Sequence, residues 1–319
     1  MDRSIIERPL GQRPPMIEPT LNYVTCPGAA AHGSATHRMA YWEWNQTGDP
    51  AHPHVIVCVH GLTRQGRDFD VLARALSAHA RVICPDVVGR GRSDWLAEAA
   101  HYGVPQYAVD MLALLQQVHA SAAIQTLDWV GTSMGGLIGM CVAGQPGLAL
   151  PAPIRKLVLN DVGPVLEWEA LQRIASYVGK QAVFEHVQQA ADALRVLSAG
   201  FGPHTDAQWL ALTKPMLKAQ EGVGLTLHYD PAIAQPMRGM TQAHSSQGQA
   251  VLWQWYDAIQ AQTLLVRGAQ SDLITQATAQ AMAQRGPKAL CVELQGIGHA
   301  PTFVADDQVA LVKDFLLGN

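Results

Sequence analysis

Charged and aromatic side chains are scarce in this sequence, and no basic cluster dominates it. Charged residues make up 15% of the 319 positions and aromatic residues 6%, and 22 Lys+Arg against 26 Asp+Glu give a net charge of −4. The absence of a clustered excess of Lys and Arg argues against a nucleic-acid partner. A hydrophobic content of 48% excludes an intrinsically disordered chain. A chain of this length can bury a large hydrophobic core.

Cysteine pairing and targeting signals are also lacking. The five cysteines show no Cys-x-x-Cys spacing, and such an unpatterned set suits a reducing cytosol. The first twenty residues, MDRSIIERPLGQRPPMIEPT, carry charges and prolines throughout and contain no apolar stretch of a secretory signal. We therefore expect a cytoplasmic protein, as a monomer or a homodimer.

No charged residue lies between Asp128 and Arg155, which raises the question of a membrane span. Glycines and prolines interrupt this stretch too often for a lipid-exposed helix. A buried strand, a tight turn and a buried helix explain it better, and we expect no membrane partner.

Strand-like and helix-like segments alternate along the chain. Short apolar runs typical of buried strands lie at His54–His60, Arg81–Pro85, Leu127–Gly131, Lys156–Leu159, Thr263–Val266 and Ala289–Leu294. Helical spacing occurs at Asp68–His79, Tyr107–His119, Met134–Ala143, Thr275–Gln284 and Gln308–Leu317. This alternation predicts an α/β fold, with a mostly parallel sheet covered by helices on both faces. The early runs around Asn22–Thr25 and Ala35–Trp44 lack a helix between them and predict an antiparallel edge hairpin.

The alternation is interrupted between residues 163 and 247, where the pattern is helical and contains several aromatic residues. Because strands and helices alternate again afterwards, we interpret this segment as an inserted helical cap. The expected organisation is an N-terminal extension at 1–20, a core at 21–162 and 248–319, and the cap at 163–247. In this position Trp168 and Trp209 are expected to roof a substrate pocket.

A nucleophile motif follows the third of the apolar runs. Gly131-Thr132-Ser133-Met134-Gly135 is a G-x-S-x-G sequence directly after the strand-like TLDWV and directly before an apolar helix. In this setting the serine lies on a sharp turn that needs small flanking residues and presents its hydroxyl above the sheet. The motif predicts that Ser133 is a nucleophile.

A serine nucleophile needs a base, and the base needs an orienting carboxylate. On this kind of sheet the partners follow in the order serine, carboxylate, histidine. His299, in the glycine-rich loop after the last expected strand, is the histidine that comes late enough. Two acids fit the order: Asp272 follows the strand TLLV, and Asp161 ends the strand before it. We favour Asp272, with Asp161 expected to line the site or to cap the first helix of the cap.

The oxyanion hole should combine the backbone N–H after the nucleophile with one from the loop after an early strand. The first is that of Met134, and the second belongs to His60-Gly61-Leu62-Thr63, where we choose Leu62. Arg64 in the same loop is a candidate for contact with a polar substrate tail, but we favour a surface or loop-fixing salt bridge for it.

Together these motifs resemble the α/β-hydrolase family of serine hydrolases, over nearly the whole chain from about Asn22 onwards. The resemblance rests on His60-Gly61, the turn from Asp86 to Ser93, the elbow at Ser133, the Asp272 loop and Gly298-His299. It implies an eight-stranded sheet, a nucleophilic Ser133, a general base His299 and an orienting Asp272 that act through an acyl-enzyme.

Two further segments narrow the resemblance. Asn160–Pro164 and Leu227–Pro231 look like a bacterial group that includes esterases active on 3-hydroxyalkanoate oligomers and other polyesters. A small ester or oligoester is the substrate that this similarity implies. Relatives with dehalogenase or epoxide hydrolase activity carry aspartate as the nucleophile, and the serine here argues against those reactions.

Cofactor and metal motifs are incomplete. Gly89-x-Gly91 lacks the third glycine of a dinucleotide fingerprint, and no GxxxxGK[ST] or HExxH occurs. His52 with His54, or His204 with His228 and His244, has no accompanying acid cluster, so we expect neither a cofactor nor a metal. Two alternatives to an esterase stay open: a carbon–carbon hydrolase or acyltransferase with the same triad, and a binding protein that keeps the fold.

Overall fold

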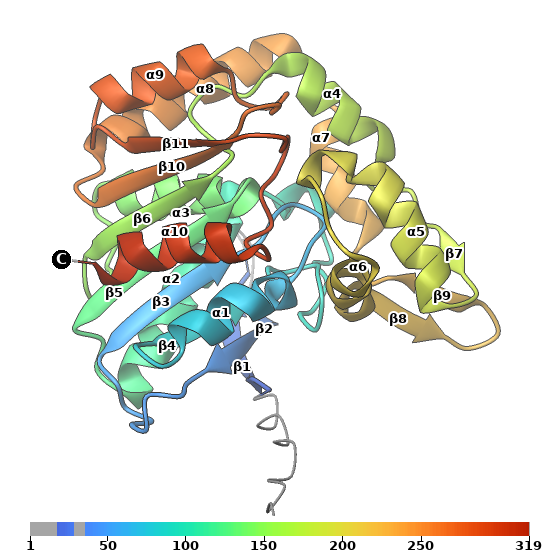
Figure 1. The fold of residues 1–319 in the computed structure, drawn as a ribbon, viewed down its shortest axis with the longest axis horizontal. Helices are drawn as coiled ribbons and strands as arrows, with labels where there is room; N and C mark the ends of the chain where they lie inside the picture. The colour runs from blue at the N-terminus through green and yellow to red at the C-terminus, as the bar shows by residue number, and fades with distance from the viewer. Residues whose placement is uncertain (1–17, 29–35, 319) are drawn as a thin grey trace, which may run out of the picture.

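The computed structural model describes residues 18–28 and 36–318 (Figure 1). Residues 1–17 of the expected N-terminal extension lie outside the described residues. The chain enters the fold at Thr20, where the first strand begins.

An eight-stranded sheet in the order β1-β2-β4-β3-β5-β6-β10-β11 forms the centre of the described fold. β1 and β2 pair antiparallel as the expected edge hairpin, β2 pairs antiparallel with β4, and the other neighbours run parallel. The expected mostly parallel sheet is confirmed. The strands are β1 Thr20–Pro27, β2 Thr36–Trp44, β3 His54–Val59, β4 Arg81–Pro85, β5 Thr126–Thr132, β6 Ile154–Asn160, β10 Gln262–Gly268 and β11 Leu290–Leu294.

Helices cover both faces of this sheet (Figure 1). Residues of α1 and α10 share one hydrophobic cluster with one face of the strands, and residues of α2, α3 and α9 share a second cluster with the other face. Strands covered on both sides can be apolar throughout, which explains why β3, His-Val-Ile-Val-Cys-Val, is buried from Val55 onwards. The core helices are α1 Asp70–Leu76, α2 Val104–Ser121, α3 Met134–Gly144, α9 Gln276–Gln284 and α10 Asp306–Leu317.

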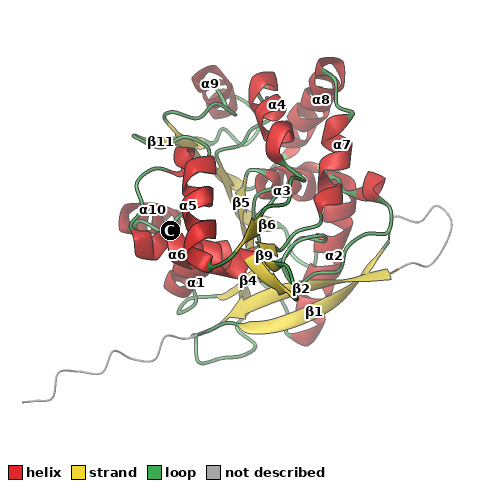
Figure 2. Ribbon diagram, turned by 90° about the vertical axis from the view of Figure 1, so that its right-hand side faces the viewer, coloured by secondary structure: helices red, strands yellow, loops and turns green. Residues whose placement is uncertain are grey.

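The segment between β6 and β10 lies over the carboxyl ends of the parallel strands (Figures 1 and 2). Its helices are α4 Trp168–Tyr177, α5 Val187–Leu197, α6 Asp206–Thr213, α7 Gln235–Arg238 and α8 Gln242–Ala258. α8 runs without a break across residues 247 and 248, where the sequence placed the end of the cap.

The cap is not helical throughout. β7 Val183–Phe184, β8 Leu217–Gln220 and β9 Gly224–Leu227 form a three-stranded antiparallel sheet in the order β7-β9-β8. The turn between β8 and β9 needs positive φ, which Gly222 (72°) and Gly224 (124°) supply. The strands are two to four residues long, too short for the alternation that reveals a strand in a sequence.

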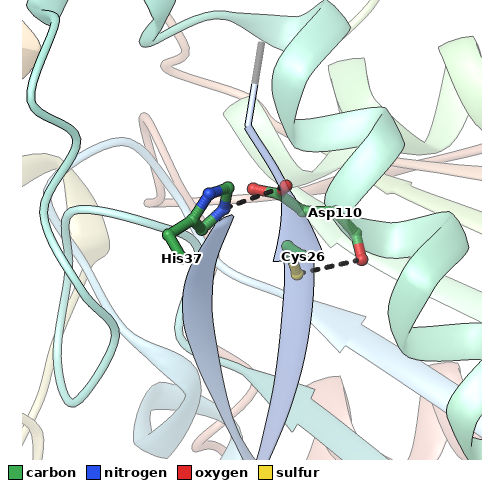
Figure 3. A group of neighbouring side chains, drawn as sticks. All are labelled: Cys26, His37 and Asp110. Atoms are coloured by element: carbon green, nitrogen blue, oxygen red, sulfur yellow. Dashed lines mark hydrogen bonds and ion pairs between the residues drawn. The ribbon is translucent and has the colours of Figure 1, made fainter. Parts of the chain in front are cut away.

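A buried polar cluster fastens the edge hairpin to α2 (Figure 3). His37 Nε2 of β2 lies 3.0 Å from Asp110 Oδ1 of α2, and Cys26 Sγ of β1 lies 3.9 Å from the Asp110 backbone oxygen. Gln106 donates to Asp110 Oδ1 at 2.7 Å and to the Pro27 carbonyl at 2.9 Å. The cluster thus joins three elements at the edge of the sheet.

In the part of the chain that the structure describes, no helix combines the length and the apolar character that a membrane crossing needs.

Candidate active site

Ser133 lies on a tight turn between β5 and α3, as the sequence predicts. Its backbone has φ 52° and ψ −116°, a conformation that non-glycine residues rarely adopt. A Cβ on Gly131 would lie 2.3 Å from the Gly135 oxygen, and one on Gly135 would lie 1.9 Å from the Val59 oxygen. The two glycines are therefore required for the turn to pack against the sheet.

His299 faces the serine hydroxyl. Its Nε2 lies 3.0 Å from Ser133 Oγ, within reach of a proton transfer. The loop that carries His299 is held on both sides. Gly298 donates its N–H to the Gly200 carbonyl of the cap at 2.7 Å, and Asn160 donates to the Pro301 carbonyl at 2.8 Å. Sequence pattern does not point to Asn160 as a residue that holds this loop, because the partners of its amide, the Pro301 carbonyl and the Thr132 hydroxyl, lie far along the chain.

The carboxylate beside His299 belongs to Asp161, and the choice of Asp272 is wrong. Asp161 Oδ2 lies 2.7 Å from His299 Nδ1. Asp272 instead accepts two hydrogen bonds from Arg173 of α4, at 2.7 and 3.0 Å, and its side chain is 48% exposed. Both acids follow strands that end at the same edge of the sheet, and the path of each loop decides which one turns inward.

Three donors converge on the Asp161 carboxylate, which is fully buried. The Gly268 N–H donates to Oδ1 at 2.8 Å, and the Ser271 hydroxyl donates to Oδ2 at 2.6 Å beside the His299 ring. Asp161 does not cap a cap helix. It has φ 53°, a left-handed conformation that Asp tolerates better than most residues. Ser271 is a further site residue that the sequence reasoning missed.

Leu62 and Met134 lie where the sequence placed the oxyanion donors. Both line the same cavity as Ser133. Among residues 18–28 and 36–318, no acceptor receives a hydrogen bond from the backbone N–H of either residue. Free N–H groups beside a nucleophile are the arrangement that an oxyanion hole requires.

Two buried side chains hold the Leu62 loop. His60 Nε2 accepts from the Val87 N–H at 2.9 Å, and His60 Nδ1 lies 2.7 Å from the Gly61 carbonyl. Burial lowers the pKa of His60 to about 3, so the ring is neutral at pH 7 and can accept and donate at once.

Arg90 is the second of these side chains and is fully buried. It donates to the Leu62 carbonyl at 2.8 Å and to the Tyr107 hydroxyl at 3.0 Å, and its Nη2 lies 3.5 Å from Met134 Sδ. In the described part of the chain, no carboxylate forms an ion pair with Arg90. The guanidinium therefore contacts both residues of the expected oxyanion hole.

A cavity of about 440 Å³ lies above Ser133, between the sheet and the cap. Its wall is mainly apolar and includes Leu171, Leu194, Phe201 and Met237. Arg64 also lines it, but its guanidinium is fixed by two hydrogen bonds to Asp68, at 2.5 and 2.8 Å. The loop-fixing salt bridge that the sequence allowed is therefore present.

Neither tryptophan roofs this cavity, and that expectation is wrong. Trp168 is half-buried at the start of α4 and does not line the wall. Trp209 is buried behind the wall, where it stacks on Phe201 with ring centroids 6.1 Å apart. The cap aromatic residues that line the cavity are Tyr177 and Phe201.

The histidines considered as metal ligands have other neighbours. His54 Nε2 lies 2.7 Å from Asp128, and His204 Nε2 lies 2.7 Å from the Thr302 hydroxyl. Within the described ranges, the sole group of three potential metal-binding side chains is Cys26, His37 and Asp110, whose ligand atoms lie within 4.8 Å of one another. Their mutual contacts are those of the cluster in Figure 3.

This arrangement of sheet, elbow and facing histidine is that of a serine hydrolase, and comparison with known proteins agrees. Residues 54–306 match the family model for the alpha/beta hydrolase fold. The chain belongs to the α/β-hydrolase family.

Individual relatives are similar over nearly the whole chain. A 3-hydroxybutyrate-oligomer hydrolase of Cupriavidus necator is 48% identical over 303 residues, which cover 94% of this chain and 98% of that protein. The crystal structure of an alpha/beta hydrolase from Novosphingobium aromaticivorans is 35% identical, with a TM-score of 0.78 and coverage of 94% and 98%. The structure of E-2-(acetamidomethylene)succinate hydrolase, 20% identical, has a TM-score of 0.72 with coverage of 93% and 100%, a likeness that shows the fold alone.

Proposed function

We propose that this protein hydrolyses the ester bonds of short 3-hydroxyalkanoate oligomers, with Ser133, His299 and Asp161 as its catalytic triad. The observation that carries the proposal is the chain of contacts from Ser133 Oγ to His299 at 3.0 Å and from His299 to Asp161 at 2.7 Å, at the floor of the cavity. The family, and the 48% identity to a 3-hydroxybutyrate-oligomer hydrolase over almost the full length of both chains, support a carboxylic-ester hydrolase.

Acylation begins when Ser133 Oγ attacks the ester carbonyl and His299 Nε2 takes the hydroxyl proton. Asp161 keeps the ring in the tautomer that leaves Nε2 free to accept, and stabilises the imidazolium that forms. The N–H groups of Leu62 and Met134 donate to the developing oxyanion. The intermediate collapses as the bond from carbon to the alcohol oxygen breaks, and His299 gives its proton to the departing hydroxyl end.

Deacylation repeats these steps with water. His299 takes a proton from the water as its oxygen attacks the acyl-enzyme, and then returns that proton to Ser133 Oγ. One ester bond and one water thus give one carboxylic acid and one alcohol, which for an oligomer are two shorter hydroxy acids. The triad and the backbone supply every group that this cycle needs.

The shape of the cavity supports a short substrate. A volume of about 440 Å³ lies in the range of about 300–1,000 Å³ that small-molecule sites occupy. The apolar wall suits the methyl groups and methylene chain of hydroxybutyrate units. A cavity walled partly by cap residues suits a soluble oligomer better than a polymer surface.

Release of 3-hydroxybutyrate from the synthetic linear dimer and trimer tests the proposal. The wild type is expected to release the monomer from both, and Ser133→Ala is expected to release none while keeping its unfolding temperature. If the folded wild type hydrolyses nitrophenyl esters but neither oligomer, the proposed substrate is wrong. If it hydrolyses no ester at all, the proposed reaction is wrong as well.

A further inference from the structure

We infer that Arg173 binds the free terminal carboxylate of the substrate, so that the enzyme selects linear oligomers by their acid end. This inference rests on the proposed function, because it concerns which oligomers the same cavity accepts. It assigns a specificity role to a residue outside the triad and the oxyanion hole.

The first observation is the sign of charge in the cavity. Among the described residues that line it, no Asp or Glu occurs, whereas Arg64, Arg173 and His244 do. A carboxylate that leaves water for an apolar wall loses hydration unless a cation meets it. A linear hydroxyalkanoate oligomer always carries one such carboxylate. The cavity wall therefore favours an anionic substrate over a cationic one.

The second observation distinguishes the two arginines. The Arg64 side chain is 11% exposed and its partner Asp68 18% exposed. Arg64 also donates to the Leu212 carbonyl at 3.3 Å and lies over the Phe201 ring at 5.6 Å. Most of its donors and one of its faces are therefore occupied. Among the described residues Arg64, like Arg173, has no hydrogen bond from Nη1, but its side chain is far less exposed than that of Arg173, so a ligand reaches Arg173 more easily.

Arg173 is differently placed. It lies on α4 of the cap, and its ion pair with Asp272 joins the cap to the loop after β10 in the core. The two side chains are 45% and 48% exposed, so solvent and an incoming ligand can reach them. Nε and Nη2 donate to the two Asp272 oxygens. The Tyr177 side chain, which also lines the cavity, lies beside the guanidinium. A guanidinium has five N–H donors, so donors beyond those on Asp272 are available to a second carboxylate.

Asp272 then acts as a positioning residue for this subsite. Its two hydrogen bonds, at 2.7 and 3.0 Å, fix the plane of the guanidinium. An exposed ion pair of this kind contributes little to the stability of a fold. The arrangement makes better sense as a means of orienting Arg173 at the cavity wall than as a support for the fold.

The test compares two substrates of equal length. One is the linear 3-hydroxybutyrate trimer with its free carboxylate, and the other is the same trimer with a primary carboxamide in its place, which is neutral and resists esterases. The quantity measured is the ratio of kcat/KM for the acid to kcat/KM for the carboxamide. The variants are Arg173→Gln, Arg173→Lys and the matched control Arg195→Gln, a cap arginine paired with Asp206 away from the cavity wall.

In the wild type the ratio is expected to exceed one. Arg173→Gln should lower it about 10- to 100-fold, the factor that a hydrogen bond between charged groups contributes. Arg173→Lys keeps the positive charge but loses the planar guanidinium, so its ratio should lie between those of the wild type and Arg173→Gln. Arg195→Gln should leave the ratio at the wild-type value. Added salt should lower the ratio of the wild type and leave that of Arg173→Gln unchanged.

Three results would overturn the inference. An unchanged ratio in Arg173→Gln, with both trimers cleaved, would show that Arg173 does not bind the carboxylate while the proposed function stands. Equal losses on acid and carboxamide would show that Arg173 acts through the structure of the cap alone. A wild type that cleaves nitrophenyl esters but neither trimer would refute the oligomer function, and the inference with it.

Discussion

Ser133 and Asp161 directly follow the neighbouring strands β5 and β6, and both have positive φ, 52° and 53°. Such conformations cost about 1–3 kcal/mol each and persist only where surrounding bonds impose them. The Ser133 N–H donates to the Asn160 carbonyl at 3.0 Å, and the Asp161 N–H donates to the Val266 carbonyl at 2.7 Å. The sheet thus maintains the strain that turns both side chains toward His299.

His60 makes the stability of the protein depend on pH. Its pKa falls from 6.5 to about 3 on folding because the ring is buried. Between these values the unfolded chain binds a proton that the folded protein does not. The contribution of His60 to the free energy of unfolding therefore falls by about 1.4 kcal/mol per pH unit as the solution is acidified below pH 6.5.

His60→Gln isolates this contribution, because glutamine can donate and accept without titrating. Urea unfolding at pH 7.5, 6.5 and 5.5 should show the stability gap between wild type and variant narrowing as the pH falls. The comparison is needed because Asp86, whose pKa burial raises to about 6, changes stability in the opposite direction. A gap that stays constant with pH would refute the account of His60.

Sequence motifs identified Ser133 and His299 because each lies in a short glycine-rich segment tied to the end of a strand. They could not decide between Asp161 and Asp272. Both follow strands at one edge of the sheet, and Ser271 directs its hydroxyl to Asp161 from the very loop that carries Asp272. The loops that carry Asp161 and Asp272 pack against each other, and this packing decides which carboxylate meets His299. The local sequence pattern does not contain that information.

At the scale of elements, α3 depends on small residues where it approaches its neighbours. A Cβ on Gly139 would lie 2.5 Å from Trp129 Nε1 of β5, and one on Gly144 would lie 2.0 Å from the Trp255 backbone oxygen of α8. The contact at Gly144 joins the helix behind the nucleophile to the helix that leads out of the cap.

Gly144→Ala is therefore expected to destabilise the protein by about 1–3 kcal/mol, because backbone has to move to admit the methyl group. Gly248→Ala is the matched control. It lies within α8, no atom lies within 4 Å of its added Cβ, and alanine is favoured over glycine in a helix by about 0.5–1 kcal/mol. Urea unfolding of both variants measures the difference. Equal stabilities would contradict the close packing of α3 on α8.

The strands and helices of the core could be predicted well because each strand has five or more residues in a mainly apolar run and each helix has a helical spacing of apolar residues. β7, β8 and β9 could not, since strands of two to four residues have no period to detect. The roles assigned to Trp168 and Trp209 failed for a related reason. Helical spacing shows which residues share a face, but not whether that face meets the cavity or the core.

At the scale of the whole molecule, the cap and the core each supply part of the cavity wall, with the triad on the core side. Substrate length should therefore depend on cap residues that line the wall, and hardly on cap residues that do not.

Leu171→Trp fills part of the cavity from α4. It should lower kcat/KM for nitrophenyl esters with acyl chains of eight or more carbons about tenfold relative to kcat/KM for the acetate. The reason is that each methylene left unburied costs about 0.8 kcal/mol. Trp168→Leu, one turn away on the same helix and outside the wall, should leave the chain-length profile unchanged. A larger change in Trp168→Leu than in Leu171→Trp would refute this division.

The proposed triad requires that Asp161, and not Asp272, orients His299. The most direct test is kcat/KM for nitrophenyl butyrate in wild type, Asp161→Asn and Asp272→Asn, with unfolding temperatures to confirm that each variant folds. Asp161→Asn should lose about 10³- to 10⁴-fold, because asparagine favours the wrong imidazole tautomer, and Asp272→Asn should stay within about threefold. Loss of activity in Asp272→Asn with activity retained in Asp161→Asn would contradict the account.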